Sequence, residues 1–294
     1  MKDAGRLALY FVAVVFAGAV IAPVLFWSAQ YLGRHDRLTF LREFEFEQFF
    51  HRALLVSALL FLWPLLRSVG VRRLSDLGLR RNVRGWRDWG GGLLVALVPL
   101  ILCGVALVLT GVYALRPVIA WAQLMRTVAA ALAVPWIEEA FFRGLVLGIL
   151  LRSGRRYLAI ALTSGLYSIV HFLKAPEGTS TDVNWASGFQ SIAHAFVQFG
   201  QPMLLLAGFT TLFLIGWILA DARIRTASLW LPIGLHAGWI FGNGVFNRFA
   251  RRQFILLPWL GRNLLVGLIP LAILAVTWMV VRMTWKSRES AGTV

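Results

Sequence analysis

The chain has 294 residues, of which 59% are hydrophobic and only 14% are charged, and its formal net charge at pH 7 is +16. The mean hydropathy is +0.73. These values exclude an ordinary soluble globular protein and a disordered one. The length suits one bundle of about eight membrane spans at roughly 20 apolar residues each. The single cysteine, Cys103, excludes an intrachain disulfide and a cysteine-based metal cluster.

The apolar runs predict an all-α, polytopic membrane helix bundle. In chain order, the predicted spans cover 7–32, 47–66, 90–114, 118–151, 157–174, 202–220, 226–246 and 263–283. We expect an N-terminal transmembrane hairpin at 1–66 and a core at 67–294, within a single membrane domain. The run 118–151 is too long for one simple span. Pro135 is expected to break or kink it, because proline lacks a backbone donor and clashes with the preceding turn.

The first run has two interpretations. Lys2 and Arg6, an apolar stretch and then Ala17-Gly18-Ala19 are typical of a cleavable signal peptide. The apolar residues continue to Leu32, however, beyond the usual length of such a segment. This favours an uncleaved first span.

The arginines predict the orientation of the chain. A soluble chain this basic would suggest nucleic acid as a partner, but these arginines form short clusters between apolar runs. Such clusters are typical of the cytoplasmic ends of membrane helices, so no nucleic-acid partner is expected. If loop 67–88 is cytoplasmic, both termini and the turns at 152–156 and 223–225 are cytoplasmic too. Loop 248–262, which also carries arginines, disagrees. A bacterial inner membrane is the predicted location.

Charged residues deep in a span are informative, because a charge at the bilayer centre costs about 2.5–3.5 kcal/mol. Glu138, Glu139 and Arg143 occur together in PWIEEAFFRG. On a helix, Glu139 and Arg143 share a face in the favoured order for an ion pair, whereas Glu138 points about 100° away. A buried pair that only fixes helix packing would explain Glu139 and Arg143, but it would leave Glu138 without a purpose.

Two histidines lie in other predicted spans. His171 follows Tyr167 by one helical turn, and His236 precedes Asn243 by two. A lone histidine on an apolar helix is more often a packing residue than a functional one. At 1.5 Å per residue, however, Glu138, His171 and His236 all lie roughly 16–23 Å from the arginine turns on one predicted side. Their similar depth favours a shared site.

The ordered motifs resemble those of a known family. EEAFFR at 138–143, YSIVH at 167–171 and His236 are similar to the pattern EExxxR, FxxxH and HxxxN of the CPBP intramembrane proteases. That family includes the CAAX prenyl proteases and the Abi-type bacteriocin-processing or immunity proteins. LSDLGLRR at 74–81 also resembles the segment that often precedes the family's core, and the resemblance covers about 70–285.

The resemblance implies a site and its chemistry. The catalytic residues would be Glu138, which activates water, His171, which assists it, and His236, which stabilises the oxyanion with the family's usual Asn. The supporting residues would be Glu139, Arg143, Tyr167 and Asn243. Two positions depart from the pattern. Tyr167 replaces a phenylalanine and can still pack, but Ile240 stands where the family has Asn. Asn243 is one turn too far to replace it unless the helix deforms.

Metal dependence is open in this interpretation. Glu138, His171 and His236 could bind zinc and leave one position for water, but no HExxH motif is present. A metal-free glutamate mechanism is favoured by the resemblance.

The favoured function is an intramembrane endopeptidase that hydrolyses a membrane-associated or CAAX-like substrate. The expected partners are membrane lipid and a peptide or protein substrate, prenylated or not. The alternative is a catalytically weak or inactive binding or immunity-type protein of the same fold, which Ile240 favours. A transporter with a proton relay is disfavoured, because it would show paired repeats.

Overall fold

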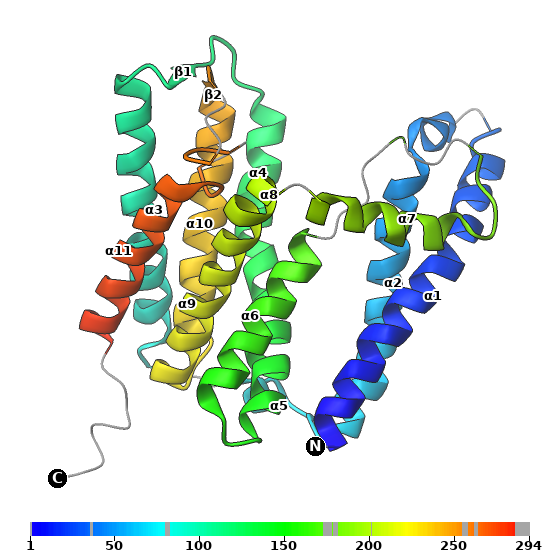
Figure 1. Ribbon diagram of the computed structural model, residues 1–294, viewed down its shortest axis with the longest axis horizontal. Helices are drawn as coiled ribbons and strands as arrows, with labels where there is room; N and C mark the ends of the chain where they lie inside the picture. Colours follow the sequence, from blue (N-terminus) through cyan, green and yellow to red (C-terminus); the bar gives the residue numbers. More distant parts are fainter. Residues whose placement is uncertain are drawn as a thin grey trace. The chain divides into compact units, whose positions relative to one another are not determined.

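The computed structural model describes residues 2–35, 38–79, 83–172, 178, 182–200, 202–254, 258–261 and 264–285. It is built almost entirely of helices, which confirms the all-α prediction (Figure 1). The chain divides into two compact units, Met1–Arg72 with Val170–Gln201 and Arg73–Ile169 with Pro202–Val294. The division between 1–66 and 67–294 stays a prediction.

The first unit is a helical hairpin with a third helix against it. Its elements are α1 (Lys2–Leu32), η1 (Thr39–Glu43), α2 (Phe46–Ser68), α7 (Ser187–Phe196) and η4 (Val197–Gly200). α1 and α2 approach closely through small residues, since Ala19, Ala22 and Ala53 are fully buried. A Cβ on Gly18 would lie 2.6 Å from Cδ2 of Leu54. Small residues at such seams let apolar helices pack backbone to backbone.

The second unit holds the remaining elements. Its first half contains η2 (Leu74–Leu77), α3 (Gly85–Leu109), β1 (Tyr113–Leu115), α4 (Trp121–Glu139), the π-helix η3 (Ala140–Val146), α5 (Leu147–Leu151) and α6 (Arg156–Phe172). Its second half contains α8 (Pro202–Leu204), the π-helix η5 (Leu205–Phe209), α9 (Thr210–Thr226), α10 (Trp230–Phe249), β2 (Ala250–Arg252) and α11 (Leu268–Thr284). The last three residues of α6 fall in the first unit.

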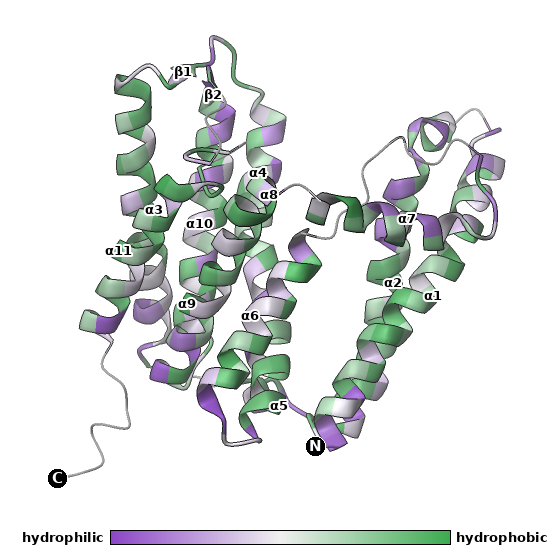
Figure 2. Ribbon diagram, viewed as in Figure 1, coloured by the Kyte–Doolittle hydropathy of each residue, from purple (hydrophilic) through white to green (hydrophobic). Residues whose placement is uncertain are grey.

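Each predicted span overlaps a helical stretch of the described residues. By length and composition, four stretches there are able to cross a membrane: α1, α2, α3 and Leu205–Thr226. α11 is apolar but shorter. Hydrophobic residues cover most of the helices, and many of the hydrophilic ones lie near helix ends and connections (Figure 2). The chain is therefore an integral membrane protein, as its composition predicts.

Of the break or kink predicted at Pro135, the break is wrong, and the kink stays a prediction. α4 continues through Pro135 to Glu139, and the departure from α-helical geometry comes later, in the π-helix η3. Membrane helices tolerate proline because neighbouring helices and local adjustments satisfy the freed backbone groups. A π-helix has i→i+5 hydrogen bonds and is frequent at functional sites. Here it follows Glu139 directly and contains Arg143.

Glycines set the close packing of α10 on α3. Gly234, Gly238 and Gly242 recur at four-residue spacing, and a Cβ on Gly238 would lie 2.5 Å from the carbonyl oxygen of Leu93. This is the small-xxx-small pattern of membrane helix interfaces. His236 lies two residues from Gly234, which is about 200° around the helix. The glycine face therefore meets α3, while His236 is turned toward α4.

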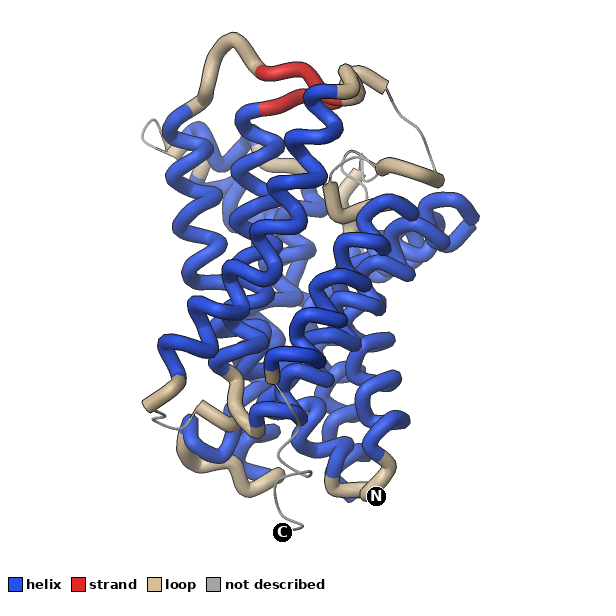
Figure 3. The backbone as a smooth tube through the Cα atoms, turned by 90° about the vertical axis from the view of Figure 1, so that its left-hand side faces the viewer, coloured by secondary structure: helices blue, strands red, loops and turns tan. Residues whose placement is uncertain are grey.

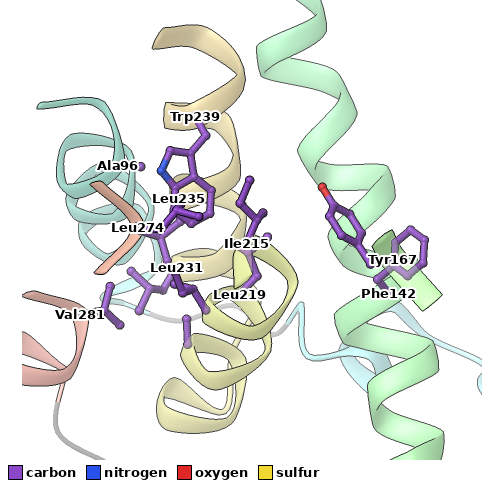
Figure 4. Close-up of a cluster of buried hydrophobic side chains, with 12 residues drawn as sticks. Ala96, Phe142, Tyr167, Ile215, Leu219, Leu231, Leu235, Trp239, Leu274 and Val281 are labelled. Atoms are coloured by element: carbon purple, nitrogen blue, oxygen red, sulfur yellow. The ribbon is translucent and has the colours of Figure 1, made fainter. Parts of the chain in front are cut away.

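The core of the second unit lies between α10, α9 and their neighbours. Its buried side chains include Leu231, Leu235 and Trp239 of α10, Ile215 and Leu219 of α9, Ala96, Leu274 and Val281 (Figure 4). Phe142 and Tyr167 belong to the same cluster, with their ring centroids 5.1 Å apart in an edge-to-face arrangement. This contact joins η3 to α6 beside the predicted catalytic residues.

The two short strands, β1 and β2, pair antiparallel at one end of the helices of this unit (Figure 3). Two of the arginines that disagree with the predicted orientation have local partners here. Nη1 of Arg248 donates to Oε1 of Gln123 at 2.6 Å, and Arg252 donates to the carbonyl oxygen of Gly261. These contacts give two of the arginines a structural use that does not depend on membrane orientation.

Candidate active site

Glu139 is fully buried at the end of α4 and has two close partners. Its Oε1 accepts a hydrogen bond from Nη1 of Arg143 at 2.9 Å. The same oxygen lies 2.7 Å from Nδ1 of His236 on α10. One carboxylate oxygen thus joins the predicted ion pair to a histidine that is 97 residues away in sequence.

Arg143 is held from three helices. Besides Glu139, its Nη2 donates to the carbonyl oxygen of Gly216 on α9 at 3.3 Å. Its guanidinium carbon lies 4.5 Å from the centre of the Tyr167 ring on α6. α9 and α6 are themselves close, because a Cβ on Gly216 would lie 2.9 Å from Cα of Ser164. The guanidinium therefore fixes the orientation of Glu139 and is itself fixed.

Glu138 occupies a different environment from its neighbour. Its side chain keeps a quarter of its surface exposed, and its Oε2 lies 3.8 Å from Nε2 of His236. The imidazole is thus flanked by two glutamates, one near each ring nitrogen. Because Glu139 also accepts a hydrogen bond from Arg143, we assign Nδ1–H of His236 as the donor in the contact with Glu139. Nε2 is then the nitrogen that faces Glu138.

Packing holds the imidazole in this orientation. His236 is buried, and the buried Tyr167 ring lies edge-on to it, with a centroid distance of 6.2 Å. Tyr167 therefore contacts both His236 and Arg143. An aromatic ring at this position packs between the two groups that bind Glu139.

His171 lies in the last turn of α6 and is half-buried. It falls among the residues counted with the first unit. Its part in the site stays a prediction.

The amide of Asn243 has partners of its own. Its Oδ1 accepts hydrogen bonds from Nδ2 of Asn247 at 3.2 Å and from the backbone N–H of Leu264 at 3.1 Å. In the described part of the chain, no hydrogen bond joins it to Glu138, Glu139 or His236. Ile240, one turn after His236, brings no polar group to the position where the resemblance implies an amide.

The donor set for a metal ion is incomplete in the described residues. There, no group of three or more His, Cys, Asp or Glu side chains is arranged to hold a metal. Glu138 and Nε2 of His236 form a close pair, one short of the three protein ligands of a catalytic zinc. Zinc binding stays a prediction, and no step below passes through it.

The link between Glu139 and His236 is the feature that sequence reasoning missed. Helical spacing pairs Glu139 with Arg143, but it carries no information about a residue on a distant helix. Glycine spacing on α10 is the signal that was available, because it identifies the face that meets α3 and so the opposite face, which carries His236.

The comparisons with known proteins concern the middle of the chain. Residues 120–242 match the family described as type II CAAX prenyl endopeptidase Rce1-like. The match begins before α4 and ends within α10, one residue before Asn243, so it is shorter than the resemblance predicted over 70–285. No curated protein and no solved structure matches the chain. The segment that carries Glu138, Glu139, Arg143, Tyr167 and His236 is therefore similar to the type II CAAX prenyl endopeptidases of the Rce1-like family.

Proposed function

We propose that the protein is an intramembrane endopeptidase in which Glu138 activates water and His236 stabilises the oxyanion. The observation that carries the proposal is the imidazole of His236 flanked by two carboxylates, at 2.7 Å from Glu139 and 3.8 Å from Glu138. Glu139 and Glu138 then have separate tasks. The family match over 120–242 supports the reaction class.

Glu138 is the carboxylate that we assign to the water. Its side chain is a quarter exposed although its Oε2 is buried, whereas the Glu139 side chain is fully buried and held by Arg143. A distance of 3.8 Å between Oε2 of Glu138 and Nε2 of His236 is too long for a direct hydrogen bond. It suits one water molecule that contacts both atoms. Glu138 would take a proton from this water as its oxygen attacks the substrate carbonyl, and would pass that proton to the leaving amine.

His236 would stabilise the negative charge on the carbonyl oxygen. When the ring is protonated at both nitrogens, Nε2–H donates to the oxyanion while Nδ1–H stays on Glu139. Such a preorganised donor is worth about 3–4 kcal/mol of barrier. Glu139 and Arg143 contribute indirectly, because they hold the orientation of the His236 imidazole. His171 would assist the same water, as the resemblance implies.

The substrate is proposed to be a peptide or protein at the membrane with a CAAX-like end, prenylated or not. The protein would lie in a bacterial inner membrane with both termini in the cytoplasm. These assignments rest on the family match and on the arginine clusters.

The test is cleavage of prenylated and unprenylated CAAX-like peptides by the purified protein in liposomes. Glu138→Gln is expected to lower the rate about 10²–10⁴-fold, because general acid–base catalysis contributes that much. Glu43→Gln is the matched control, since it removes the same charge from an exposed residue of η1. A parallel assay with a chelator separates a metal-dependent reaction from a metal-free one. Unchanged cleavage by Glu138→Gln would reject the assignment of the base.

A second candidate function is a catalytically silent binding protein with the same fold. Ile240 favours it, because it brings no polar group one turn after His236, where the resemblance implies a second oxyanion donor. If the wild type cleaves none of the peptides and Ile240→Asn restores cleavage, the silent function is supported. If Ile240→Asn only slows an active wild type, the silent function is rejected.

A further inference from the structure

A second buried carboxylate of the second unit, that of Asp221, contacts residues of three helices, α9, α11 and α6. Asp221 of α9 accepts two hydrogen bonds at Oδ2, from Nε of Arg225 at 2.8 Å and from Nε1 of Trp278 on α11 at 3.1 Å. Its Oδ1 lies 3.6 Å from Nη2 of Arg156, the first residue of α6. These residues lie in the last turns of α9 and α11 and the first turn of α6.

A further arginine extends this cluster to the surface. The guanidinium carbon of Arg282 lies 4.9 Å from the centre of the Trp278 ring. The Arg282 side chain is exposed and that of Arg156 is 28% exposed, whereas that of Arg225 is only 10% exposed. Asp221 therefore fixes Trp278, and Trp278 supports Arg282. We call Arg156, Asp221, Arg225, Trp278 and Arg282 the helix-end cluster.

The helix-end cluster has an excess of positive charge. The guanidinium groups of Arg156 and Arg225 approach the single carboxylate, that of Asp221, and the third, that of Arg282, packs on Trp278. Arg156 and Arg282 are the two arginines of the cluster with the most exposed side chains. Neither of them belongs to the candidate active site. In a membrane protein the ends of the helices lie at the level of the lipid headgroups.

We propose that the helix-end cluster binds the phosphate of an anionic phospholipid headgroup, with Arg156 and Arg282 as the contacting residues. The planar guanidinium fork matches phosphate oxygens in two-point hydrogen bonding. Tryptophan is enriched at the membrane–water interface, where Trp278 would lie beside the headgroup. Basic pockets between membrane helices bind such headgroups. The proposal does not depend on the proposed function or on which face of the membrane is cytoplasmic.

The test measures lipid binding and needs no peptidase activity. The purified protein in nanodiscs of phosphatidylcholine is titrated with phosphatidylglycerol, and bound lipid is counted by native mass spectrometry. Arg156→Gln with Arg282→Gln is expected to weaken phosphatidylglycerol binding about tenfold or more. The matched control is Arg126→Gln with Arg251→Gln, which removes two exposed arginines from the end of the unit that carries β2. The control is expected to retain wild-type binding.

Two outcomes would overturn the proposal. One is an equal loss of binding in the control, which would indicate a general effect of charge. The other is binding of inorganic pyrophosphate to Arg156 and Arg282 with no preference for phosphatidylglycerol over phosphatidylcholine, because it would assign the cluster to a soluble phosphate compound. Arg156→Lys with Arg282→Lys covers the case in which the glutamine variant fails to fold. This variant keeps both charges but loses the two-point geometry, so partial retention of binding is expected.

Discussion

Two acid–arginine pairs of the same spacing lie in the second unit and differ in almost everything else. Glu139 with Arg143 and Asp221 with Arg225 both place an acid four residues before an arginine. The first pair has no exposed side-chain surface, and its carboxylate also binds His236. The second lies near the helix ends, where Trp278 shares the carboxylate.

The difference shows that the depth of an acid–arginine pair along the helices determines which other side chains reach it. Deep in the helices, the Glu139 carboxylate contacts His236 and Arg143, and the same histidine lies near Glu138. Near the helix ends, Arg156 is a second arginine close to Asp221, and Arg282 packs on the tryptophan that binds it. Local spacing of acid and arginine is the same in both cases, so spacing alone does not distinguish them.

The largest expected effect is the loss of Arg143. Arg143→Gln leaves Glu139 as a buried charge, and breaking a buried pair costs about 3–5 kcal/mol of stability. Thermal unfolding in detergent measures this loss. Glu139→Gln with Arg143→Gln removes both charges and is expected to recover much of the stability without recovering cleavage. If Arg143→Gln unfolds at the wild-type temperature, the pair does not stabilise the deep position.

A smaller effect is expected at the carbonyl that holds Arg143. Gly216→Ala places a Cβ within 3 Å of the Ser164 backbone, and overpacking of this kind costs about 1–3 kcal/mol. Because the displaced carbonyl accepts from Nη2 of Arg143, cleavage should fall together with thermal stability. Gly148→Ala is the control, since nothing lies within 4 Å of a Cβ at that position. Equal behaviour of the two variants would contradict the close contact of α9 with α6.

The Asp221–Arg225 pair near the helix ends should be less sensitive to substitution than the Glu139–Arg143 pair. Asp221→Asn keeps an acceptor for Trp278 but leaves the nearly buried Arg225 without its carboxylate. The loss of stability should be smaller than the roughly 3–5 kcal/mol expected for breaking a fully buried pair. Peptide cleavage should stay close to the wild-type rate. A loss of cleavage as large as that of Arg143→Gln would show that the two pairs are not functionally distinct.

The smallest effect concerns salt. Raising the ionic strength screens the contact of the partly exposed Arg156 with Asp221 and leaves fully buried pairs almost unchanged. The stability difference between the wild type and Asp221→Asn should therefore shrink at 1 M salt by a few tenths of a kcal/mol, while the difference for Arg143→Gln should not. The measurement is thermal unfolding of the three proteins at low and high salt.

The helical spans were predictable because a membrane leaves a chain few alternatives to long apolar helices. Each predicted span overlaps a helix of the described residues. α4 continues past Pro135 for a related reason, because neighbouring helices and local adjustments satisfy the backbone groups that a proline frees in a membrane helix.

The candidate site was predictable only in part. Glu139 and Arg143 share a turn, so their contact follows from helical spacing. The contact of Glu139 with His236 depends on how two helices are rotated, and the apolar pattern does not define that rotation. The π-helix over Ala140–Val146 adds to this difficulty, because it shifts the helical phase within the motif itself. His171 and its part in catalysis stay predictions.

The glycine face of α10 has a consequence for how mutations act on this gene. Every single-base change that replaces a glycine introduces a larger side chain, and Gly234, Gly238 and Gly242 have no room for one against α3. In random mutagenesis, inactivating substitutions should therefore fall on two faces of α10. One face carries these glycines and the other carries His236. The two classes would separate by abundance, since glycine substitutions deplete the protein from the membrane and His236 substitutions leave it there. The position of His236 on α10 thus depends on glycines of the opposite face, and any substitution of these glycines is expected to disturb the packing of α10 on α3.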